Sequence, residues 1–102
     1  MEYKFQLARD GIHKYKVTLP SGKTVKFGAS GYGDYIQYSK SNKVTALIKK
    51  KSYISRHKVN ENWKDLTKPG TWARYILWNK STLHSSMRNM ENKFGIRIKN
   101  VM

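Results

Sequence analysis

The chain contains no cysteine, few acidic residues and no long apolar run. Without cysteine, it forms no disulfide bond, no thiolate metal site and no cysteine nucleophile. The longest apolar cluster, Trp72 to Trp78, already contains Arg74, and no stretch approaches the roughly 20 apolar residues that a membrane span needs. We therefore expect a soluble protein whose fold depends on packing alone.

The six acidic residues include no pair that suits general acid–base chemistry. Glu61 and Asp65 stand four positions apart, but Lys64 and Lys68 beside them favour ordinary surface pairing. The sequence therefore predicts no catalytic residues.

The three histidines, His13, His57 and His84, are far apart and lie near no acidic cluster, so we expect no metal site and no cofactor. The segment from Gly11 to Tyr15 is faintly similar to the start of small tyrosine-based nucleases. The Tyr, Arg and metal-binding Glu set of those enzymes cannot be assembled here, which favours a non-enzymatic protein.

The charge is strongly unbalanced. Twenty-one Lys and Arg residues against six Asp and Glu give a formal net charge of +15. Like-charge repulsion opposes compaction, so the excess points to a polyanionic partner: nucleic acid, an anionic membrane face or acidic protein surfaces. Sixteen of the cations are Lys and five are Arg, which favours diffuse electrostatic contact over base reading.

The cations extend from Lys4 to Lys99, and 38% of the residues are apolar, which indicates one folded domain over residues 1–102. Residues 1–38 read as β-rich, with turn signals at Asp10-Gly11 and at Pro20 to Lys23. Strict alternation predicts an antiparallel meander with one apolar and one cationic face. The predicted apolar face holds Tyr3, Phe5, Leu7, Tyr15, Val17, Leu19, Val25 and Phe27, and the cationic face holds Lys4, Lys14, Lys16 and Lys26.

Residues 42–94 read as helical. The segment 42–58 suits a helix or a strand, and we favour the helix, whereas 35–38 suits a short strand. Thr71 is the predicted cap of a buried helix that begins at Trp72, and Ser81 or Thr82 caps the next one. That next helix has an apolar stripe, ends at Gly95 and precedes a short strand at 96–98, and the stripe comprises Leu83, Met87, Met90 and Phe94. The predicted fold class is α+β, a meander packed against two or three C-terminal helices with a short C-terminal strand.

Four local patterns together resemble a family of small basic proteins of unknown function, encoded by large double-stranded DNA viruses of eukaryotes. The patterns are Lys26 to Tyr35 (KFGASGYGDY), Tyr53 to His57 (YISRH), Glu61 to Trp63 (ENW) and Trp72 to Leu83 (WARYILWNKSTL). The resemblance extends over residues 14–98 and departs most between Ser39 and Lys51. It implies a setting in the virion, or in the host cytoplasm or viral factory during assembly, and it supplies no catalytic residues.

The densest basic run, Lys49 to Lys51, is the first candidate for binding phosphate groups. A solvent-exposed helix face without a binding role would show the same pattern. Trp63 lies in a polar segment and is the candidate surface aromatic residue for base stacking, with core packing as an equal alternative. The candidate polyanion-binding residues are Lys14, Lys16, Lys26, Lys43, Lys49, Lys50, Lys51, Arg56 and Lys58.

Two functional interpretations follow. The first is a non-enzymatic structural protein of the virus particle, of minor capsid or internal scaffold type. Its cationic surface would bind acidic capsid-protein surfaces, double-stranded DNA or an anionic inner membrane, and it would have no small-molecule substrate. The alternative is a sequence-independent DNA-binding protein that helps to package the genome.

Overall fold

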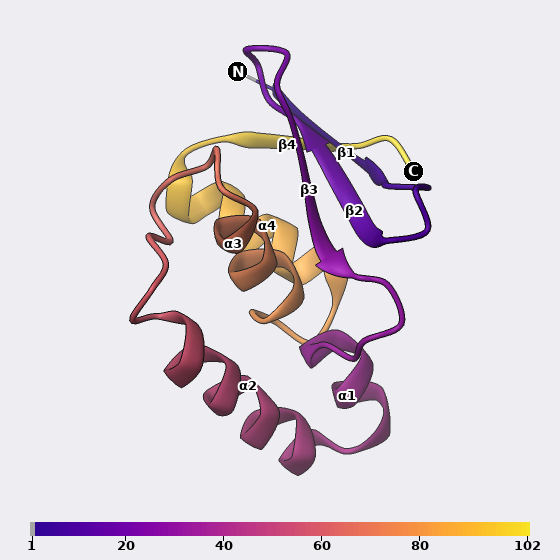
Figure 1. The fold of residues 1–102 in the computed structure, drawn as a ribbon, viewed down its shortest axis with the longest axis vertical. Helices are drawn as coiled ribbons and strands as arrows, with labels where there is room; N and C mark the ends of the chain where they lie inside the picture. The colour runs from indigo at the N-terminus through magenta and orange to yellow at the C-terminus, as the bar shows by residue number, and fades with distance from the viewer. Residues whose placement is uncertain (1) are drawn as a thin grey trace.

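Three N-terminal strands form an antiparallel meander, and a short C-terminal strand joins the edge of this sheet (Figure 1). The structure, a computed structural model, describes residues 2–102. The sheet order is β3-β2-β1-β4, with β4 parallel to β1. The predicted α+β class, with its meander, helices and closing strand, is confirmed. The elements are β1 (Glu2–Leu7), β2 (His13–Thr18), β3 (Thr24–Ala29), α1 (Tyr35–Ser41), α2 (Lys43–His57), α3 (Pro69–Trp72), the π-helix η1 (Ala73–Leu77), α4 (Leu83–Phe94) and β4 (Arg97–Asn100).

The apolar face of the sheet packs against the C-terminal helices. Phe5 and Val17 are directly opposite each other on β1 and β2, and both are fully buried. Trp72 lies over this face, its ring centroid 6.2 Å from that of Phe27, and its indole nitrogen donates to the Leu66 carbonyl at 2.9 Å. The core comprises Phe5, Val17, Leu19, Val25, Phe27, Trp72, Ile76, Leu77, Met87 and Met90. Strand alternation therefore predicted the buried sheet face, apart from Leu7, which is exposed at the end of β1.

The α3–η1 segment begins earlier than the sequence suggests. Pro69 occupies the first turn after Lys68, a position where its fixed φ fits and its missing N–H costs nothing. Thr71 is therefore inside the helix, not at its cap. It is fully buried, and its hydroxyl donates toward the carbonyls of Asp65 (2.6 Å) and Asn62 (3.2 Å). The predicted Thr71 cap is wrong because the proline starts the helix first.

Helix α4 follows its sequence signals closely. The Thr82 hydroxyl accepts from the Ser85 N–H at 3.1 Å, and Gly95 ends the helix in the left-handed region at φ 64°. Met87 and Met90 on its apolar stripe are buried against the sheet. The chain then returns as β4 alongside β1. The alternation from residue 96 onward predicted the strand but not its neighbour in the sheet.

Residues 35–38, predicted as a short strand, belong instead to helix α1. The Asp34 carboxylate accepts from the Gln37 N–H at 3.0 Å, which starts a helix. Asn42 ends α1 and caps α2, accepting from the Val44 and Thr45 N–H groups. The preferred helical interpretation of 42–58 is thus confirmed by α2, which Figure 1 shows on the far side of α3 and α4 from the sheet.

Candidate polyanion-binding surfaces

One cationic surface covers the face of the sheet opposite the helices. Lys16 and Lys26 are directly opposite each other on β2 and β3, and Lys4 and Lys99 pair in the same way on β1 and β4. Like charges at directly opposed positions destabilise a sheet, typically by a few tenths of a kcal/mol to about 1 kcal/mol. We call this the sheet surface, and its cations are Lys4, Lys16, Lys26, Arg97 and Lys99.

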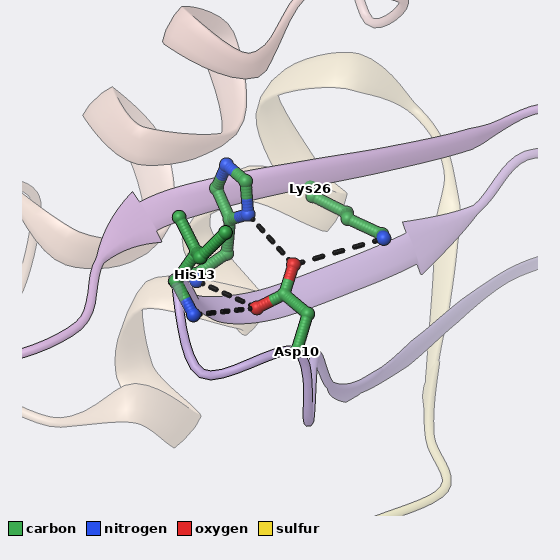
Figure 2. Close-up of polar contacts among 4 residues, drawn as sticks. Asp10, His13 and Lys26 are labelled. Carbon is green, nitrogen blue, oxygen red and sulfur yellow. Dashed lines mark hydrogen bonds and ion pairs between the residues drawn. The ribbon is translucent and has the colours of Figure 1, made fainter.

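Asp10 neutralises one end of the sheet surface (Figure 2). Its carboxylate accepts from the N–H groups of Ile12 (2.9 Å) and His13 (2.8 Å), and it lies 2.9 Å from the His13 ring nitrogen Nδ1. The Lys26 ammonium is 3.7 Å from the same carboxylate. The hydrogen bond from the His13 backbone, followed by those from its side chain and from Ile12, lowers the pKa of Asp10 well below 3.8. Asp10 therefore stays ionised and fixes the β1–β2 turn, while Lys26 remains half exposed.

Lys14 does not belong to the sheet surface, although strand alternation assigned it there. Its side chain is only 14% exposed, and its ammonium lies 2.5 Å from the Asp34 carboxylate. The opposing residue on β3 is Gly28, where a Cβ would come within 2.7 Å of a Leu77 methyl carbon and 3.3 Å of the Lys14 Cβ. Lys14 therefore joins the sheet to the start of α1 and has no free charge for a partner.

A second cationic surface covers the outside of α2. The 26 residues between Asp34 and Glu61 contain seven cations and no acidic residue. Five of the candidate binding residues are exposed on or directly after this helix. We call them the α2 surface: Lys43, Lys49, Lys51, Arg56 and Lys58.

Lys50 differs from its two neighbours in the basic run because it points inward. Its ammonium donates to the Asn79 carbonyl at 2.7 Å and lies 4.8 Å from the centre of the Tyr35 ring. Burial, and then the nearby Arg74 and Lys80 charges, lower the pKa of Lys50. Lys50 therefore fastens α2 to the end of η1, and we assign it a structural role in place of the predicted binding role.

Trp63 is half-buried in an aromatic cluster that holds α2 to the body of the protein. Tyr53 stacks on Trp78 with ring centroids 4.7 Å apart, and Trp63 lies nearly parallel to Tyr53 at 6.4 Å. Arg74 lies over the Trp63 ring at 5.5 Å. Packing thus accounts for much of the Trp63 ring, and its role as a surface aromatic residue stays a prediction.

Five of the six acidic side chains make contacts within the fold, and the sixth, Glu2, is opposite Arg97 in the sheet register. Asp34 caps α1 and pairs with Lys14, and a Glu61 carboxylate oxygen pairs with the His57 ring. Glu91 accepts from the Ile98 N–H at 2.8 Å, which ties α4 to β4. Between residues 2 and 102, no three His, Asp or Glu side chains converge as a metal site would require. These carboxylates serve the structure.

A cavity of about 410 Å³ lies between α2 and the end of β3. Its walls include Phe27, Tyr53 and Trp78, and its polar groups are the Lys14–Asp34 and His57–Glu61 pairs. Each charge there already has a partner of opposite sign. The cavity therefore presents no uncompensated charge to a ligand.

Sequence reasoning missed Arg97 and Lys99 as members of the sheet surface. Their alternation with Ile96 and Ile98 carried the same period-two signal as β1 to β3. The signal alone does not say that β4 returns parallel to β1, which aligns Lys99 with Lys4. That pairing depends on how the helices carry the chain back across the sheet.

Comparison with known proteins gives one partial match. A protein-family model described as a family of unknown function (DUF5754) matches residues 3–44, which span β1 to β3, α1 and the start of α2. No curated protein and no solved structure shows significant similarity to the chain. Within the described residues, the helices are too short or too polar to cross a bilayer. The match includes part of the sheet surface and attaches no activity to it.

Proposed function

We propose that this protein is a non-enzymatic structural protein of a large DNA virus particle, of minor capsid or internal scaffold type. Its cationic surfaces bind acidic surfaces of other capsid or virion proteins, or DNA or an anionic inner membrane. The viral setting comes from the resemblance over residues 14–98. The distribution of the cations supports the mode of action.

The arrangement of the cations in two separate surfaces carries the proposal. The sheet surface faces away from the helices, and α2 lies beyond α3 and α4, so the two cationic surfaces are on different sides of the body (Figure 1). The molecule is 38 Å long in its longest dimension and 22 Å in its shortest. A body that is cationic on two sides can join two anionic surfaces, as a scaffold protein does.

The electrostatic free energy of the isolated protein supports a permanent anionic partner. Opposed lysines across the sheet, a helix without acidic residues and a net charge of +15 all raise the electrostatic free energy of the isolated protein. Contact with a polyanion relieves this repulsion and, for a nucleic acid, releases counterions. The commitment of Asp34, Glu61 and Glu91 to the fold supports a binding role over catalysis.

A second candidate function is sequence-independent binding of DNA during genome packaging. The excess of Lys over Arg favours it, because Lys makes diffuse phosphate contacts and Arg reads bases by two-pronged hydrogen bonds. The exposed lysines on both surfaces provide such contacts. This function needs only one of the two surfaces at a time.

Fractionation of purified particles tests the proposal against this second candidate. A structural protein stays with the shell, at constant stoichiometry to the capsid protein, after the genome has been extracted. A packaging protein leaves with the DNA. Absence from the particle would contradict both functions.

A further inference from the structure

Three large aliphatic side chains on α2 point into solvent. Val44 is 68% exposed, Leu47 49% and Ile48 63%. The opposite side of the same helix is packed on the body, where Ala46 and Tyr53 are buried. Val44, Leu47 and Ile48 therefore lie on the outer face of this helix, and the inner face is attached through an alanine, a lysine and aromatic contacts.

These three residues form one continuous patch. Spacings of three and one place Val44, Leu47 and Ile48 along one side of a helix with 3.6 residues per turn, and Lys51 continues that side. We call the three residues the α2 stripe. Lys43 and Lys51 lie beside it, Lys58 follows at the C-cap about 15 Å beyond Ile48, and the helix has no acidic side chain.

Helix stability does not explain the α2 stripe. Exposed Val and Ile are poorer helix formers than Lys, Gln or Glu, so polar residues at 44 and 48 would suit an isolated helix surface better. Exposed apolar side chains that cluster on one face, rimmed by charge, are typical of interaction sites.

We propose that the α2 stripe docks an acidic amphipathic helix of a partner protein. Apolar side chains of that helix cover Val44, Leu47 and Ile48, and its flanking Asp and Glu residues contact Lys43, Lys51 and Lys58. This inference deepens the proposed function, because it names the class of virion protein that the α2 surface binds and how the contact gains specificity beyond charge.

Charge complementarity selects this occupant. A second copy of the chain would bring a like-charged, acid-free helix against the same face, which repulsion opposes. A lipid surface is reached through wider apolar faces with Trp, Phe or several Leu residues, whereas the α2 stripe offers three aliphatic side chains and no aromatic ring. A helix with a narrow apolar seam and acidic flanks matches both the width and the charge.

The test measures binding of a fluorescent helical peptide with leucine in a heptad seam and glutamate at the flanking positions. We expect the intact protein to bind it, and a scrambled peptide of the same composition to bind at least tenfold more weakly. Replacing the α2 stripe with glutamine (V44Q, L47Q and I48Q together) keeps the charge and does not weaken the intrinsic preference for helix. This variant should lose at least tenfold in affinity for the seam peptide while retaining its affinity for duplex DNA and its melting temperature.

A matched control is Ile12→Gln, which removes an equally exposed aliphatic side chain from the β1–β2 turn. It should leave peptide binding unchanged. Equal binding of the seam and scrambled peptides, or unchanged peptide binding in the triple variant, would overturn the inference.

Two further measurements identify a wrong occupant. Binding to phosphatidylserine vesicles that the triple variant alone loses, without peptide binding, would assign the α2 stripe to a membrane. Concentration-dependent dimerisation that the same variant abolishes would assign it to a second copy. If the wild-type protein binds DNA but not the peptide, this inference alone is contradicted. If it binds no polyanion, the proposed function is contradicted as well.

Discussion

At the scale of single residues, lysines of similar sequence context have different roles. Lys49 and Lys50 are neighbours, yet Lys49 is exposed and Lys50 donates to the Asn79 carbonyl. Lys14 and Lys16 are two positions apart on one strand, yet Lys14 is paired with Asp34. Position along the chain therefore does not identify the binding cations, because the partner of each internal lysine comes from a distant segment.

Substitution of Lys50 should affect stability, and substitution of Lys49 should affect binding. Lys50→Gln removes a charge-assisted hydrogen bond, partly offset by relief of the nearby positive charges, and should lower the free energy of unfolding by about 1–2 kcal/mol. Lys49→Gln should change it by at most about 0.5 kcal/mol, because Lys49 is exposed and its cation–π contact with Tyr38, at 5.6 Å, is long. Urea denaturation measures both, and equal stability losses would contradict the assignment.

The same pair should behave in the opposite way in DNA binding. Lys49→Gln should make the slope of log binding constant against log salt concentration shallower by about one, because one phosphate contact is lost. Lys50→Gln should leave the slope unchanged, since its charge is already engaged inside the fold.

Asp10 makes the stability of the β1–β2 turn depend on pH. Its hydrogen bonds hold the pKa in the folded protein well below the ordinary 3.8, so the unfolded chain binds this proton more tightly. The stabilisation is complete above pH 3.8 and is lost as the pH falls from there through the lowered pKa. NMR titration of the Asp10 carboxyl carbon should show it still ionised at pH 3, and a midpoint at 3.8 would contradict the turn geometry.

At the scale of elements, the sequence predicted where helices and strands form better than which side of a helix faces the core. Alternation identified the strands and their buried face, and caps at Thr82 and Gly95 identified α4. The helix predicted over 42–58 was also correct, but the α2 stripe faces outward because Tyr53 and Lys50 supply the inner contacts. Those contacts involve Trp78 and Asn79, far along the chain, and no local pattern reports them.

The attachment of α2 depends on the stack between Tyr53 and Trp78, with Tyr38 also near the Trp78 ring. Trp78→Ala should lower the free energy of unfolding by about 3 kcal/mol, at the lower end for loss of a large aromatic side chain because the ring is only partly buried. Hydrogen exchange should speed up most in α2, whose local opening becomes easier than global unfolding. Uniform acceleration across the sheet and helices would contradict this view of α2 as a separately attached element.

At the scale of the whole molecule, the positive charge is concentrated on two sides of one folded body. Sheet lysines are aligned by strand register, and α2 lysines are displayed by a helix held away from the sheet. Two acidic residues pair with single lysines, Asp34 with Lys14 and Asp10 with Lys26, and Glu61 pairs with His57. The remaining exposed lysines leave both surfaces positive.

Bridging of two polyanions tests this account most directly. Short DNA duplexes labelled with a donor or an acceptor dye are mixed with the protein at low salt, and energy transfer between duplexes is measured. The protein is 38 Å long, so two duplexes bound to one molecule lie close enough for energy transfer. We predict transfer with the wild-type protein. Removing three of the five cations from either surface alone (K4Q, K26Q and K99Q, or K43Q, K51Q and K58Q) should preserve DNA binding and strongly reduce the transfer. Binding of one duplex without transfer, or no binding at all, would contradict the account.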